Sequence, residues 1–186
     1  MTRADENDSA APKFSPGLVT SDEILLRTII DPDHLGPNGT LSVAAVALED
    51  IRQRGWSVNR KKFTSLRRLR YIHSEKKAKK TTIIRFFVLP VAVSYFRKPG
   101  PVTGKQDFVV IDDASWENPA HASVLLASAC SPGQARQFRN HLLQNLPKYV
   151  DVETVFSPRD KPGHCLGRAK QLFAFASWCL RFLFSL

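Results

Sequence analysis

One histidine, His121, has acidic residues close to it in a polar stretch rich in turn residues. Asp112 and Asp113 precede it directly after the apolar run 108–111, and Glu117 lies between them and the histidine. A carboxylate that accepts a hydrogen bond from an imidazole orients the ring and raises its pKa, which prepares a histidine for general acid or base catalysis. The candidate catalytic residues are therefore His121, Asp112 and Asp113.

The same stretch also has a structural interpretation. Asn118-Pro119 is typical of an Asx-type turn, so 114–121 is predicted to be a loop between two strands that His121 locks through main-chain hydrogen bonds. Because side chains alternate along a strand, Asp112 and Asp113 should point to opposite faces, and only one can approach His121. We expect His121 to have this structural role, and the catalytic role stays open as the alternative. Ser42 and Ser57 are interpreted as a helix cap and a strand residue rather than as nucleophiles.

The sequence contains no motif for nucleotide binding, serine hydrolysis or zinc proteolysis. Its three cysteines, Cys130, Cys165 and Cys179, are scattered and form neither a disulfide framework nor a metal-ligand spacing. His164-Cys165 is a possible ligand pair, but nothing nearby completes four ligands. We therefore predict no metal and no cofactor. The cysteine pattern and the polar N-terminus, which lacks a signal-peptide apolar run, favour the cytoplasm.

The net charge of +10 comes from one segment, because residues 51–105 hold sixteen Lys and Arg against a single acid, Glu75. Such a segment attracts phosphates by counterion release, and Phe63, Tyr71, Trp56 and Phe86 are spaced among the cations where they can stack on unpaired bases. A solvated charged segment is the alternative. The predicted nucleic-acid-binding residues are Arg67, Arg68, Arg70, Lys76, Lys77, Lys79 and Lys80.

Periodicity and turn residues predict the elements that position these groups. Helices are expected at 43–54, capped by Ser42, and at 132–146, opened by a Ser131/Gln134 capping box with Pro132 at its first position. Strands are expected at 56–60, at 108–111 and at 150–156, and residues 83–96 are expected to form either two short strands or one strand that Pro90 breaks at an edge of the sheet. Residues 122–129 fit a strand or a short helix. Residues 24–30 fit a buried strand or a helix behind a Thr20/Glu23 capping box.

These elements predict an α+β fold, with one compact domain at 20–156 built on a small mixed or antiparallel sheet and two main helices. The basic segment 61–80 belongs to this domain. Residues 1–19 are predicted to be a disordered leader, 157–168 a linker, and 169–186 an apolar C-terminal helix. The fifteen apolar residues 172–186 are too few for the roughly 20 that span a bilayer, so this helix is expected to dock on the domain, on a partner or on a membrane surface.

Several pieces of the chain resemble a family of short, functionally uncharacterised bacterial proteins. The pieces are Arg27-Thr-Ile, Pro32-Asp-His-Leu, Asn38-Gly-Thr-Leu-Ser, Trp56-Ser-Val-Asn-Arg (LSV-type) and Glu117-Asn-Pro-Ala-His-Ala (NPAHA-type). The resemblance implies a bacterial cytosolic protein and gives His121 added weight, but it implies no reaction. The chain departs from the pattern at Trp56, where the family has Leu, in the basic segment, and in the apolar tail.

Three functions follow from these observations. The first is a bacterial accessory protein that binds nucleic acid or an acidic protein partner through the basic segment. The second is a small hydrolase or transferase acting on a nucleotide or nucleic acid, with His121 as general acid or base. The third is a protein held at the surface of the inner membrane by 169–186 together with the basic segment. We expect the first, without enzymatic activity.

Overall fold

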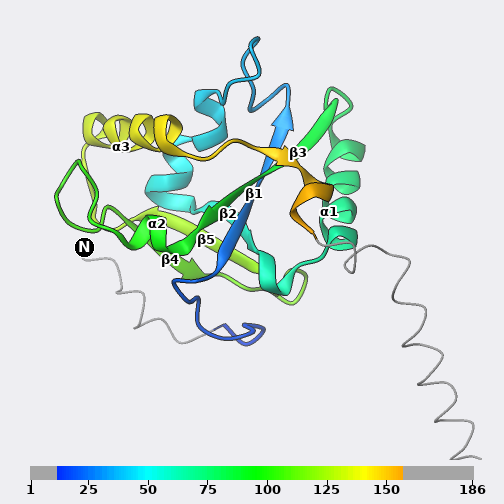
Figure 1. Cartoon of the computed structure of the whole chain (residues 1–186), viewed down its shortest axis with the longest axis horizontal. Helices are drawn as coiled ribbons and strands as arrows, with labels where there is room; N and C mark the ends of the chain where they lie inside the picture. Colours follow the sequence, from blue (N-terminus) through cyan, green and yellow to red (C-terminus); the bar gives the residue numbers. More distant parts are fainter. Residues whose placement is uncertain (1–11, 157–186) are drawn as a thin grey trace, which may run out of the picture.

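Six strands form one sheet in the order β4-β5-β2-β1-β3-β6, and every neighbouring pair is antiparallel (Figure 1). The computed structural model describes residues 12–156. The predicted α+β class with an antiparallel sheet is confirmed. The strands are β1 (Ile24–Asp31), β2 (Trp56–Arg60), β3 (Arg85–Ala92), β4 (Phe108–Asp112), β5 (His121–Leu126) and β6 (Val150–Asp151).

Helices lie on both sides of this sheet (Figure 1). The main ones are α1 (Leu66–Lys79) and α3 (Pro132–Asn145), each of 14 residues, and α2 (Val93–Arg97) is a single turn. The capping box predicted for α3 is present, since Ser131 and Gln134 bond each other's main-chain N–H groups. Short helical turns complete the fold: η1 (Val43–Val46), η2 (Asp50–Arg54), η3 (Lys61–Phe63) and η4 (Val152–Val155).

The larger core fills the space between one face of the sheet and α2, α3, η1 and η2. Trp56 and Phe96 are fully buried in it, and Ala135, Phe138 and Leu142 bring the apolar face of α3 onto the sheet. A smaller core lies on the opposite face, where Leu66 and Leu69 of α1 pack against the strands. These α1 contacts involve Leu26 of β1 and Val88 of β3, so α1 covers the part of this face formed by those two strands.

Several local predictions differ from the structure. The expected helix at 43–54 is interrupted, because Ala47 adopts an extended conformation between η1 and η2. The alternative of a solvated charged segment does not describe all of 61–80, since α1 buries Leu66, Leu69 and His73. The expected strand at 150–156 is limited to β6, after which the chain turns into η4.

Pro90 does not break the strand as predicted, because β3 runs continuously from Arg85 to Ala92. On the side away from β1, β3 pairs with β6 only at Phe87 and Val88. At Pro90, no strand among residues 12–156 pairs with β3 on this side, so the missing N–H of proline costs no ladder hydrogen bond there. The next residues, 93–97, form the helical turn α2 rather than a second strand.

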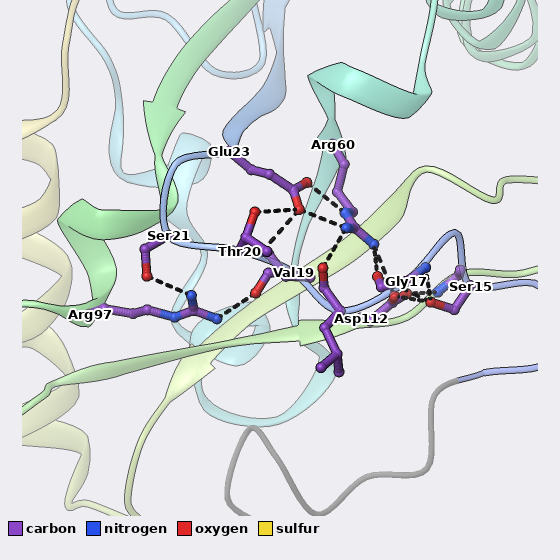
Figure 2. Close-up of polar contacts among 11 residues, drawn as sticks. Ser15, Gly17, Val19, Thr20, Ser21, Glu23, Arg60, Arg97 and Asp112 are labelled. Atoms are coloured by element: carbon purple, nitrogen blue, oxygen red, sulfur yellow. Dashed lines mark hydrogen bonds and ion pairs between the residues drawn. The ribbon is translucent and has the colours of Figure 1, made fainter.

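A buried arginine, Arg60 at the end of β2, connects three distant segments (Figure 2). Its guanidinium binds both carboxylate oxygens of Glu23 at 2.7 and 2.8 Å and the carboxylate of Asp112 at 3.0 Å. It also donates to the main-chain oxygens of Gly17 and Leu18. Burial raises the pKa of Glu23, but the hydrogen bonds from Arg60 and Thr20 outweigh this effect and hold that pKa below its usual value.

The contacts of Arg60 show that two predictions about the N-terminal part of the chain differ from the structure. The leader expected at 1–19 is too long, because Gly17 and Leu18 bind Arg60 and Val19 is buried. Thr20 and Glu23 do not cap a helix; they form a turn before β1 that directs the Glu23 carboxylate to Arg60.

Residues 1–11 and the predictions for 157–168 and 169–186 lie outside the described residues. Within residues 12–156, no helix has the length and apolar character needed to cross a membrane.

His73 of α1 gives the fold a predictable dependence on pH. Burial, assisted by the charge of Lys76, lowers its pKa from 6.5 to about 4. As the pH falls from 6.5 toward 4, the unfolded chain takes up a proton that the folded chain excludes, so the folded state loses stability. Burial also lowers the pKa of His34 from 6.5 to about 4, so His34 likewise makes the folded state less stable as the pH falls.

We expect His73→Phe, which keeps the stacking on Phe86, to reduce the loss of unfolding free energy between pH 7 and pH 4.5 by about 2 kcal/mol. Urea unfolding at the two pH values measures this difference. His141→Phe, at a partly exposed position on α3, is the control for replacing a histidine away from this contact. An unchanged pH dependence in His73→Phe would show that His73 is not the group responsible.

Candidate functional site

A groove of about 690 Å³ lies between α1 and the loop that joins β4 to β5, residues 113–120. Leu66, Leu69 and His73 of α1 are buried against the sheet, and one flank of the same helix, which includes Arg68 and Tyr71, forms one wall of the groove. Trp116 and Glu117 of the 113–120 loop form the other wall. We call this feature the basic groove; it is lined by Arg68, Tyr71, Ile72, Glu75, Lys76, Lys79, Trp116 and Glu117.

Each wall of the basic groove carries an exposed aromatic ring. Trp116 is 72% exposed and Tyr71 is 54% exposed, which is unusual for rings of this size. Arg68 connects the walls, because its guanidinium lies 5.4 Å from the centre of the Tyr71 ring and donates a hydrogen bond to the main-chain oxygen of Glu117. The groove therefore combines two accessible π-faces with cations along one helix.

The predicted nucleic-acid-binding residues fall into three groups. Arg68, Lys76 and Lys79 line the basic groove, and Arg67 and Lys77 are exposed on α1 outside it. Arg70 and Lys80 form ion pairs with Glu153 and Asp33. Within residues 12–156, Lys76, Lys77 and Lys79 have no acidic partner within ion-pair distance, so their charges are available to an anion.

Two of the predicted stacking residues are engaged within the domain. Trp56 is fully buried and donates its indole N–H to the main-chain oxygen of Ala45, and Phe86 stacks on His73 with ring centres 4.2 Å apart. Trp116 provides an accessible ring instead, although it is not among the residues predicted from the sequence. The sequence feature that could have indicated Trp116 is a large aromatic residue in a polar turn, where no strand or helix periodicity predicts that the ring is buried.

His121 lies at the start of β5, where β5 pairs with β2. Its Nε2 is 2.8 Å from the hydroxyl of Ser57, and its Nδ1 is 3.1 Å from the main-chain oxygen of Asp113 and 3.3 Å from the Asp113 carboxylate. The predicted loop is present, and the chain turns at Asn118-Pro119 through main-chain bonds: Ser115 and Asn118 bond each other's main-chain groups, and the N–H of His121 donates to the main-chain oxygen of Asn118. The Asx-type hydrogen bond is not formed, because Oδ1 of Asn118 has no hydrogen-bond partner among the described residues.

Only one of the two candidate aspartates reaches His121. Asp112 points to the other face, where it binds Arg60, and Asp113 stands beside the imidazole, as the alternation of a strand requires. The hydroxyl of Ser123 donates to the Asp113 carboxylate at 2.9 Å and so holds it in place. Gly55, at φ +89°, lies against Ser123, and a Cβ there would be 2.6 Å from the Ser123 side chain. The absence of a side chain at Gly55 therefore leaves room for Ser123, whose hydroxyl holds the Asp113 carboxylate.

His34 and Ser42 do not join this cluster. His34 accepts a hydrogen bond from the main chain of Ile30, and burial is the main reason why its pKa falls to about 4. Ser42 caps the turn η1 and bonds the main-chain oxygen of Asp33. In the part of the chain that the structure describes, no three His, Cys, Asp or Glu side chains are grouped as metal ligands would be.

No family model, no curated protein and no solved structure matches the chain. The resemblance to short bacterial proteins therefore stays a prediction. Two of the pieces on which it rests, 56–60 and 117–122, are brought together by the pairing of β2 with β5.

We expect His121→Ala to lower the free energy of unfolding by about 1–3 kcal/mol, because it removes the hydrogen bonds that join β2 to the end of β4. Urea denaturation measures the loss. His141→Ala is the control, since within the described part of the chain that ring bonds Asn145 on its own helix and no other residue, and it should change stability by less than about 0.5 kcal/mol. Full stability of His121→Ala would contradict the structural role of the ring.

Proposed function

We propose that the chain binds single-stranded nucleic acid in the basic groove. The observation that carries this proposal is the pair of exposed rings, Tyr71 and Trp116, on opposite walls of a groove whose helix also presents Lys76 and Lys79. Exposure of an aromatic ring to water costs hydrophobic free energy relative to burial. A ligand that covers Tyr71 and Trp116 removes this cost, so their exposure favours a binding role.

Charge and stacking contribute differently to such binding. Lys76 and Lys79 neutralise phosphates, and the counterions released weaken binding as salt rises, with a slope of about 0.7 per phosphate for a single strand. Stacking of a base on an aromatic ring contributes about 1–3 kcal/mol and depends little on sequence. A single strand offers both groups to the groove, whereas the bases of a duplex are already stacked on each other. The ligand favoured is therefore an unpaired strand.

The basic residues outside the groove extend the same surface. Arg67 and Lys77 are exposed on α1 and can follow the phosphate backbone beyond the groove. Arg70 and Lys80 contribute less, because an anion must compete with Glu153 and Asp33 for them. This ranking reduces the seven basic residues expected from the sequence to the five that have no acidic partner among residues 12–156.

We expect micromolar binding of a fluorescein-labelled 12-nucleotide strand at 50 mM salt, weakening steeply toward 200 mM. Lys76→Gln/Lys79→Gln should weaken binding and lower the salt slope by roughly 1.4, the value for two lost phosphate contacts. The matched control is Lys98→Gln/Lys105→Gln, which removes the same charge from exposed positions outside the groove. Fluorescence anisotropy at four salt concentrations measures both quantities.

The rings are tested separately, because charge alone would also bind other polyanions. Trp116→Ala should weaken binding about tenfold or more, and Trp116→Phe should retain most of it. Absence of binding at 50 mM salt would overturn the proposal. Equal losses in the groove pair and the control pair would reduce it to a net-charge effect, and equal affinity of Trp116→Ala would remove the stacking.

A further inference from the structure

Ser57, His121 and Asp113 form a connected row on the face of the sheet opposite α3. Ser57 is exposed on β2, and its hydroxyl lies 2.8 Å from Nε2 of His121 on the neighbouring strand β5. On the other side of the ring, the Asp113 carboxylate lies 3.3 Å from Nδ1. A hydroxyl, an imidazole and a carboxylate in this order are the groups that activate a serine for attack on a carbonyl carbon.

The surroundings of the ring fix which nitrogen carries the proton. Nδ1 is close to two acceptors, the main-chain oxygen and the carboxylate of Asp113, so it carries the hydrogen. Nε2 then keeps its lone pair and accepts the hydrogen bond of the Ser57 hydroxyl. This tautomer is the one in which the imidazole can take a proton from serine.

The row is held by the sheet and by the hydrogen bonds of the 113–120 loop. Ser57 and His121 stand on paired strands, and Ser123, directly opposite Ser57 in the register, donates to the Asp113 carboxylate. Asn118 ties the loop to β2 through its bond with Asn59. Groups placed on strands keep their geometry better than groups placed on free loops.

We propose that Ser57 is a nucleophile, activated by His121 and oriented through Asp113, that hydrolyses activated esters with small apolar acyl groups. Ile111 and Leu125 are partly exposed on the same face of β4 and β5, beside Ser123, and offer contact to an apolar acyl chain. The main chain of β2 lies in the plane of the sheet, so its N–H groups do not point at an oxyanion above the Ser57 hydroxyl. Substrates with good leaving groups, such as aryl esters and thioesters, depend least on such donors.

The reaction begins with His121 neutral and ends in the same state. Ser57 Oγ bonds to the carbonyl carbon while its proton passes to Nε2, and the bond to the leaving group breaks as that group takes the proton from Nε2. Water then attacks the acyl-serine and gives a proton to Nε2; the carboxylic acid departs as Ser57 Oγ recovers that proton. The sum is ester and water to acid and alcohol, or to thiol for a thioester.

The test is covalent labelling of the whole chain with a fluorophosphonate, followed by mass spectrometry of the intact protein and of its peptides. We expect one phosphonate per chain, on Ser57, and none in Ser57→Ala. His121→Gln should slow labelling by at least about a hundredfold, as loss of a general base does. Asp113→Asn should slow it because the amide no longer fixes the tautomer. Ser128→Ala, at an exposed serine outside the row, should label like the wild type.

The same variants are assayed for hydrolysis of p-nitrophenyl acetate, with urea unfolding as the check that each is folded. Asp113 is 58% exposed, so Asp113→Asn keeps the test decisive even when His121→Gln does not fold. Nitrogen-15 NMR of the wild type should show the His121 proton on Nδ1. Absence of label on Ser57, or labelling of folded Asp113→Asn at the wild-type rate, overturns the proposal. Neither result bears on strand binding in the basic groove, which is measured separately.

Discussion

The structure depends on one buried cation. Arg60 is 1% exposed and joins the start of the described chain, the end of β2 and the end of β4 through Glu23, Asp112 and two main-chain oxygens. A charge at this depth is tolerated only when it is fully paired, so these segments must meet around it. By holding Asp112 on one face of β4, Arg60 also turns Asp113 to the opposite face, where it meets His121. The end of β4 therefore positions Asp112 for the ion pair with Arg60 and Asp113 for the candidate site at His121.

The two faces of the sheet are used differently. One face is covered by α2, α3 and the turns η1 and η2, and it holds the main core. On the other face α1 packs on β1 and β3, while Ser57 and His121 stand on β2 and β5 beyond its core contacts. The 113–120 loop serves both candidate sites, because it supplies Trp116 to the basic groove and Asp113 to the serine. Arg68 and Asn118 attach this loop to α1 and to β2, so that its position is fixed from two sides.

Local signals in the sequence predicted the parts that local physics decides. The cap of α3, the turn at Asn118-Pro119 and most of the strands followed from side-chain chemistry and alternation. The helix at 43–54 was wrong because an apolar stripe does not reveal that the chain bends at Ala47. Ser57 was interpreted as an ordinary strand residue, because its partner lies 64 positions away. Arg60 and Trp116 were missed for a related reason: only the assembled sheet shows which arginine is enclosed and which ring is left outside.

The unfolding free energy of Arg60→Met tests most directly whether this cation organises the fold. The substitution keeps an apolar stem but leaves the Glu23 and Asp112 carboxylates uncompensated, so a loss of about 3–5 kcal/mol is expected. Adding Glu23→Gln and Asp112→Asn removes the stranded charges and should recover part of that loss. Arg54→Met breaks an exposed pair with Glu49 and should cost less than about 1 kcal/mol. If Arg60→Met costs no more than Arg54→Met, or if the added neutral partners recover nothing, Arg60 does not have the role assigned to it.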